Sequence, residues 1–66
     1  MSAEEALSRA EKLLERVEET RRQLEQTDDS EQAIEILSQL SELAKEVEAE
    51  LSRARREAEA EADASA

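Results

Sequence analysis

Carboxylates are the residues of this sequence with the most scope for chemistry. Of its 66 residues, 19 are Asp or Glu, and several Glu pairs stand four apart, among them Glu15–Glu19, Glu42–Glu46 and Glu46–Glu50. Paired carboxylates can hold a metal, but a di-iron helix bundle also needs Glu-x-x-His motifs, and the sequence has no His. On a helix, such Glu pairs are neighbours that mildly repel each other. They therefore predict a solvated face and no reaction centre.

The other reactive groups lack the partners that catalysis requires. A serine nucleophile needs a base to activate it, and neither His nor Cys is present. The two lysines, Lys12 and Lys45, fall on faces that we expect to be exposed. Zinc ligands and a Gly-rich phosphate loop are also missing. We expect no catalysis by this chain alone, no cofactor and no metal site.

Basic residues cluster at Arg53, Arg55 and Arg56. One interpretation is that they complement the helix dipole and pair with Glu4 or Glu5 at the surface. The other is a small patch that contacts phosphate. The net charge of −10 repels phosphate backbones, so we expect no direct binding of nucleic acid. The acidic surface is typical of a solvated face, and docking onto a basic partner is the functional alternative.

A first helix is expected over about residues 3–26. Ser2 and Glu5 form a capping-box pair at its start. The apolar spacing then alternates between three and four residues and predicts a seam, with Ala6 and Leu13 on its flank. The seam comprises Ala3, Leu7, Ala10, Leu14, Val17, Arg21 and Leu24. Arg21 either lays its aliphatic stem along the seam or pairs there with an acid of a partner.

A second helix is expected over about residues 30–58. Its seam comprises Ala33, Leu37, Leu40, Ala44, Val47, Leu51, Ala54 and Ala58. Ile36 and Leu43 lie beside this seam, and Ile34 lies further round. The apolar face is wider than a two-stranded seam needs. One edge can therefore meet the first helix while the other meets a second chain; the alternative is an ordinary, well-covered helix face.

The two seams do not join in register, which predicts a turn at about residues 27–29. A continuous helix would place Asp28 and Glu31 at core positions, whereas both suit the cap of a new helix. The sequence thus predicts an all-α fold: one two-helix antiparallel, coiled-coil-like hairpin over residues 1–58, with facing residue numbers that sum to about 56. Residues 59–66 are predicted to be a frayed, acidic, Ala-rich tail.

Such a short chain is near the lower limit for an independent core. We therefore expect oligomerisation or a protein partner to complete it, in a homo- or hetero-oligomer. No apolar run exceeds two residues, so we expect no membrane span. The start of the sequence shows no secretory signal pattern, and a cytoplasmic location is expected.

Both expected helices resemble those of the small subunit of bacterial exodeoxyribonuclease VII. The stretch EALSRAEKLLERVE at 5–18 is similar to the E-x-A-L-x-x-L-E-x-I-V-x-x-L-E pattern of that family's first helix. The stretch EQAI at 31–34, followed by Leu37, Leu40 and Leu43-Ala44, is similar to its second helix. Leu37 replaces the family's aromatic residue, Leu40 replaces its Gly, and its Gly-Asp-Leu-x-Leu turn is missing.

The resemblance implies a non-catalytic accessory subunit. Such a subunit docks by its apolar helix faces onto a large catalytic subunit that degrades single-stranded DNA. The residues expected to dock are Leu13, Ile36, Leu40, Leu43 and Val47. The alternative is a self-associating helical hairpin with a structural or adaptor role.

Overall fold

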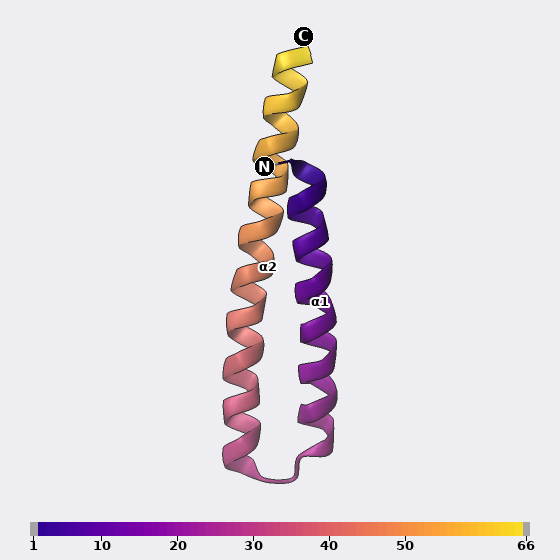
Figure 1. The fold of residues 1–66 in the computed structure, drawn as a ribbon. Coiled ribbons are helices and arrows are strands. Elements are labelled where there is room, and N and C mark those ends of the chain that lie inside the picture. Colours follow the sequence, from indigo (N-terminus) through magenta and orange to yellow (C-terminus); the bar gives the residue numbers. More distant parts are fainter. Residues whose placement is uncertain (1, 66) are drawn as a thin grey trace.

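The protein is a pair of antiparallel helices joined by a short turn. Its computed structural model describes residues 2–65, in which helix α1 spans Ala3–Gln26 and helix α2 spans Ser30–Ser65. The helices run side by side from the turn to the start of α1, as Figure 1 shows. The Cα atoms extend over 55 × 14 × 13 Å. The predicted all-α hairpin is therefore confirmed.

Helix α1 starts and ends where its capping groups lie. The Ser2 side chain accepts a hydrogen bond from the backbone N–H of Glu5, at 3.1 Å. At the other end, Thr27 is extended (φ −91°, ψ 138°), and its N–H donates to the Gln23 carbonyl at 3.1 Å. The chain thus leaves the helix without a left-handed residue, which explains how it turns without a Gly.

Asp29 caps the start of α2. Its Oδ1 accepts from the backbone N–H groups of Glu31 at 2.9 Å and Gln32 at 3.4 Å. Across the turn, the Thr27 hydroxyl donates to Oε1 of Gln32 at 3.0 Å, so the first residue of the turn is tied to the second helix. The polar residues that break the helical pattern therefore supply the turn's own hydrogen bonds.

The two helices meet along a continuous seam whose positions alternate by three and four residues. In α1, the buried and half-buried seam positions are Ala3, Ala6, Ala10, Leu13, Val17, Thr20 and Leu24. In α2, they are Ala33, Ile36, Leu40, Leu43, Val47, Glu50, Ala54 and Glu57. This is the period of an antiparallel coiled coil. Residue numbers at one level sum to about 60; the Arg9–Glu50 contact, for example, sums to 59.

Every second position of the predicted seam is wrong by one residue. Leu7 and Leu14 are exposed, whereas the preceding Ala6 and Leu13 face α2. The same shift exposes Leu37 and Leu51 of α2, along with Ala44 and Ala58, and brings Ile36 and Leu43 into the seam. The predicted sum of about 56 for the numbers of facing residues is also wrong. It places the midpoint between the two paired helices about two residues too early in the sequence.

Small residues explain why the seam runs along this row. Ala6 and Ala10 of α1 and Ala54 of α2 are buried near the start of α1, where side chains without bulk let two backbones approach closely. Thr20 is also buried, and its hydroxyl donates to the Arg16 carbonyl at 2.7 Å. Its polar atom is therefore satisfied inside α1, as a buried hydroxyl requires.

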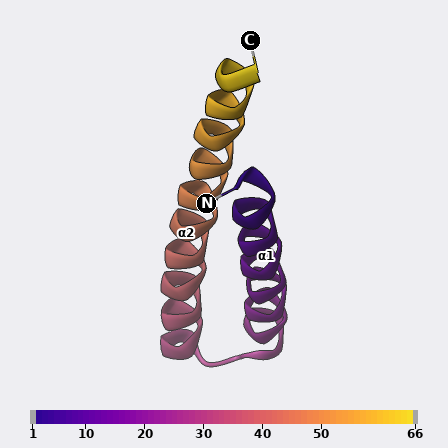
Figure 2. The ribbon, with the colours of Figure 1, turned by 45° about the horizontal axis from the view of Figure 1, so that its top comes forward.

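Helix α2 continues well past the start of α1. It reaches Ser65, so the predicted end near residue 58 is wrong. Figure 2 shows this last part of α2 extending beyond α1. Ala and Glu, which dominate the segment, have high helix propensity, and Nε of Arg55 donates to Oε1 of Glu59 at 3.1 Å. Residues 59–65 are thus helical, and Ala66 lies outside the described residues.

Candidate functional site

The five residues predicted to bind a partner all lie in the seam of the hairpin. Leu43 is 6% exposed, and the other four, Leu13, Ile36, Leu40 and Val47, are half-buried. The opposite helix covers much of each side chain. Contact with a partner through them stays a prediction, and in the closed hairpin they leave little surface for one.

A different set of large aliphatic side chains is open to solvent. Leu7, Leu14, Ile34, Leu37 and Leu51 are between 46% and 67% exposed, and we call them the leucine face. Each residue directly follows a seam position. In an antiparallel pair of right-handed helices, residues that follow the seam turn toward the same side of both helices. The five side chains therefore share one side of the hairpin.

The leucine face is also matched in level across the two helices. Leu7 and Leu51 have numbers that sum to 58, as do Leu14 and Ala44, and so do Arg21 and Leu37. Because facing residue numbers in this hairpin sum to about 60, each pair lies within about two residues, roughly 3 Å, of one height. We call each of these pairs a step of the leucine face. The step nearest the start of α1 consists of two leucines, Leu7 and Leu51.

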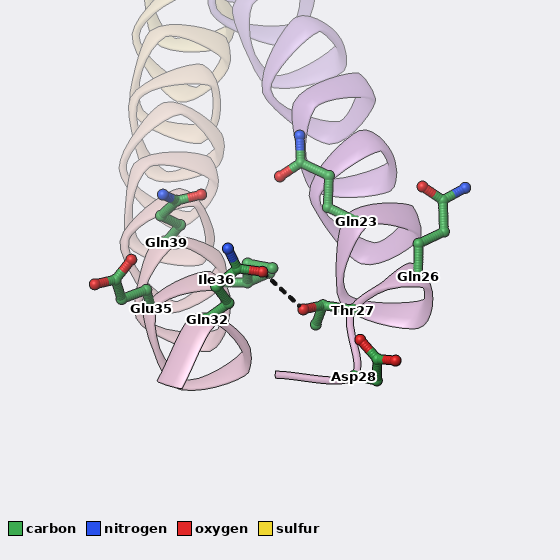
Figure 3. A pocket seen from close by; sticks show the side chains of 8 residues that line it. All are labelled: Gln23, Gln26, Thr27, Asp28, Gln32, Glu35, Ile36 and Gln39. Atoms are coloured by element: carbon green, nitrogen blue, oxygen red, sulfur yellow. Dashed lines mark hydrogen bonds between the residues drawn. The ribbon is translucent and has the colours of Figure 1, made fainter. Parts of the chain in front are cut away.

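The opposite side of the hairpin is polar. Residues that directly precede seam positions turn toward it, and three grooves between the helices open there. The groove next to the turn, of about 460 Å³, is lined by Gln23, Gln26, Thr27, Asp28, Gln32, Glu35, Ile36 and Gln39 (Figure 3). Seven of these eight side chains are polar, and the Thr27 and Gln32 side chains point toward each other across the groove. The hairpin thus has one apolar and one polar side.

A row of acids borders the leucine face along α1. Glu4, Glu11, Glu18 and Glu25 recur every seven residues, on the outer edge of that face. Arg21 forms ion pairs with both Glu18 and Glu25, and its Nε lies 3.3 Å from Oε2 of Glu18. Its hydrogen bond and charge lower the pKa of the Glu18 carboxyl, and the same pairing raises the pKa of Arg21.

Arg21 therefore lies outside the seam. Both interpretations of the sequence place it within the seam. Its guanidinium is drawn to the acidic row on its own helix. Because position 21 belongs to the same row as Leu7 and Leu14, the charge marks the end of the apolar part of that row toward the turn.

Glu50 is a charged residue within the seam. Its side chain is 14% exposed, and its carboxylate contacts Nε of Arg9 at 3.4 Å and Nη1 of Arg53 at 3.2 Å. The Arg9 contact crosses from one helix to the other. Two guanidinium partners compensate for the cost of placing a carboxylate there. Arg53 and Arg55 form ion pairs with Glu50 and Glu59 of their own helix, and contact of this cluster with phosphate stays a prediction.

The carboxylates do not assemble into a metal site. Among residues 2–65, no group of three or more Asp or Glu side chains is arranged to hold an ion. Neither helix, over the same residues, contains a stretch that is long and apolar enough to cross a membrane. The surface feature with the clearest functional content is therefore the leucine face.

The sequence predicts that four of the five residues of the leucine face are interior, all except Ile34, because both rows are apolar. In α1 a usable signal was present: the row of Leu7 and Leu14 continues into Arg21 and Asp28, whereas the row of Ala6 and Leu13 continues into uncharged threonines. In α2 the same criterion indicates the wrong row, because the seam row contains the charged Glu50 and the exposed row contains Leu51. Only the packing of α2 against α1 determines which of its two apolar rows is buried.

No protein family, curated protein or solved structure that was compared with this chain matches it.

Proposed function

We propose that this chain is a non-catalytic protein-interaction module that docks through its leucine face. The observation that carries this proposal is the one-sidedness of the hairpin. Five large aliphatic side chains lie exposed on one side, while most residues that line the three grooves on the other side are polar or charged, although Leu13, Ala49 and aliphatic stems contribute to one of them. Contiguous exposed apolar patches bordered by charge are typical of interaction sites.

The energy available from this face is adequate for association. The five exposed fractions amount to about 2.7 whole side chains, or roughly 4–8 kcal/mol if a partner covers them fully. The matching apolar surface of the partner contributes about the same again, so the total is about 8–16 kcal/mol. Association costs about 4–15 kcal/mol in lost freedom of motion. The two ranges support an interaction of modest affinity.

The narrower hypothesis, an accessory subunit of a nuclease that degrades single-stranded DNA, rests on the resemblance to the exodeoxyribonuclease VII small subunit. It remains a prediction, as does the cytoplasmic location. Co-expression with such a large catalytic subunit tests it: a complex that survives purification supports it, and separate elution of the two chains contradicts it.

Site-specific photo-crosslinking in cells that express the chain tests the interaction module itself. A photoreactive amino acid replaces Leu37 on the leucine face or, as the matched control, Gln39 on the polar side, two residues away. We expect a discrete crosslinked product from position 37 and little from position 39, because only the first position lies under a partner. Equal yields from the two positions, or none from position 37, would refute the proposal. The mass of the product reports whether the partner is another protein or the same chain.

A further inference from the structure

We infer that the occupant of the leucine face is a second copy of this chain, stacked face to face with its turn at the same end, so that four helices form one bundle. The inference rests on the proposed function because it uses the same face. It adds the identity of the partner and the arrangement of the two copies.

The apolar surface on each helix is wider than one neighbouring helix can cover. A two-stranded coiled coil needs apolar residues only at its two seam positions, whereas helices of a bundle add the next position as well. In this chain the additional position holds Leu7 and Leu14 in α1, and Leu37, Ala44 and Leu51 in α2. Each helix therefore has the pattern of a bundle helix, while the hairpin supplies only one neighbour.

The matched levels of the leucine face favour two copies with their turns at the same end. Two-fold symmetry places the same patch on both sides of an interface. With both turns at one end, each step faces its own copy at the same height. The Leu7–Leu51 step then forms a layer of four leucines, and the Leu14–Ala44 step forms a layer of two leucines and two alanines. With turns at opposite ends, the Leu7–Leu51 step faces the Arg21–Leu37 step of the second copy, so both outer layers contain an arginine and no layer consists of four leucines.

The charges along the edges of the leucine face also favour turns at the same end. With turns at opposite ends, α1 lies on α1 of the second copy, and the row of Glu4, Glu11, Glu18 and Glu25 faces the same acidic row. With turns at the same end, α1 lies on α2 of the second copy, whose corresponding edge carries Ile34, Ser41, Glu48 and Arg55. Arg55 then stands at about the height of Glu4. The same-end arrangement therefore avoids like charges along most of the interface, which favours it.

Arg21 fits this arrangement because its charge is already compensated on the edge of the face. Its ion pairs with Glu18 and Glu25 hold the guanidinium at the acidic row, away from the centre of the bundle. Leu37, at the same height, supplies the apolar contact in that layer. The four-leucine layer lies at the other end of the face, near the start of α1.

Sedimentation equilibrium tests the identity of the partner. We expect the purified chain to reach twice its mass of 7.4 kDa as its concentration rises. Leu37→Glu and Gln39→Glu each add one negative charge. The two positions are two residues apart and lie on opposite sides of α2. We expect Leu37→Glu to weaken dimerisation by about tenfold or more and Gln39→Glu to leave it nearly unchanged. A chain that stays monomeric at millimolar concentration overturns the inference.

Pulsed dipolar EPR tests the arrangement. The sequence has no Cys, so Asp28→Cys introduces a single attachment point for a spin label in the turn. With turns at the same end, the labelled positions are separated by about the diagonal of a four-helix bundle, roughly 15 Å, plus the label arms. With turns at opposite ends, they are separated by about 42 Å, because each lies 14 residues from the level of Leu14 at 1.5 Å per residue.

The outcomes separate this inference from the proposed function. A short distance in a dimer that Leu37→Glu weakens supports both. A long distance overturns the same-end arrangement but leaves the leucine face as an interaction surface. A monomeric chain that still crosslinks to another protein from position 37 overturns the second copy and retains the proposed function. A dimer of unchanged strength in Leu37→Glu overturns the second copy as the occupant of the leucine face, and the crosslink from position 37 then decides the proposed function by itself.

Discussion

Replacing Leu43 with Ala removes the most deeply buried large side chain of the seam, which is 6% exposed. Truncations of buried leucines cost about 2–5 kcal/mol. A chain of this size has roughly 3–10 kcal/mol of stability in all, so the loss is a large fraction of the total. We expect the melting temperature to fall by about 10–30 °C.

Leu37→Ala is the matched control, because it removes the same atoms from the same helix where the side chain is 52% exposed. Only about half of the side chain is buried in the hairpin, so the expected cost is about 1 kcal/mol and the fall in melting temperature about 4–8 °C. Circular dichroism at the helical band measures both. Fluorescence is unsuitable because the chain has no aromatic residue.

The comparison is made in dilute solution, where association contributes least. If Leu37→Ala lowers the melting temperature as much as Leu43→Ala there, the seam does not run through position 43 and the reasoning is refuted. At high concentration the cost of Leu37→Ala should grow, because a dimer buries that side chain, whereas the cost of Leu43→Ala arises within each hairpin.

Three further changes test the turn, the charges and the overhang. Asp29→Ala removes the acceptor for two N–H groups and should cost about 0.5–2 kcal/mol in thermal or urea unfolding; no loss would show that Asp29 is not the cap. Arg21→Gln should raise the lowered pKa of Glu18, measured by carboxyl ¹³C NMR, whereas Arg22→Gln should change it less; equal shifts would contradict the pairing. The pKa of Glu18 is lowered in the folded state, so the stability from this pair is present above the carboxyl's ordinary pKa and disappears as pH falls through the lowered value. The stabilities of wild type and Arg21→Gln should therefore converge in acid. Truncation after Glu57 removes only the overhang of α2 and should leave the melting temperature of the hairpin within a few degrees; a large fall would show that the overhang contacts the rest of the chain.

The hairpin and its turn could be predicted because the relevant signals are local. Asp28 and Glu31 would be charged core residues in a continuous helix, and this conflict alone indicated a turn. Ser2 caps the first helix as its type and position suggested. Such signals need only the chemistry of a few adjacent residues.

The phase of the seam depends on contacts between helices, which local signals do not reveal. Leu13 and Leu14 are adjacent, and either residue suits an apolar row. The choice is made by close approach at Ala6 and Ala10 and by the guanidinium groups that accommodate Glu50 in the seam. The sequence therefore places Leu7, Leu14, Leu37 and Leu51 in the interior, although it also predicts an apolar face of α2 that is wider than a two-stranded seam needs.

The predicted end of α2 near residue 58 is too early because it rests on the lack of a large apolar residue that would anchor the segment. Segment 58–65 has no seam to join, yet its alanines and glutamates favour the helical backbone. Helix propensity and packing against α1 stabilise a helix separately. Propensity extends α2 beyond the part that packs against α1.

The most direct test of the two-sided hairpin is the solvent accessibility of its leucine methyl groups, measured by NMR with a soluble paramagnetic probe at several protein concentrations. We predict that Leu13, Leu40 and Leu43 are protected at every concentration, because α1 and α2 cover them within one chain. Leu7, Leu14, Leu37 and Leu51 should be accessible in dilute solution and become protected together as copies associate. Protection of Leu37 and Leu51 with exposure of Leu43 at the lowest concentration would contradict the seam, and full accessibility of the leucine face at every concentration would contradict its role in association.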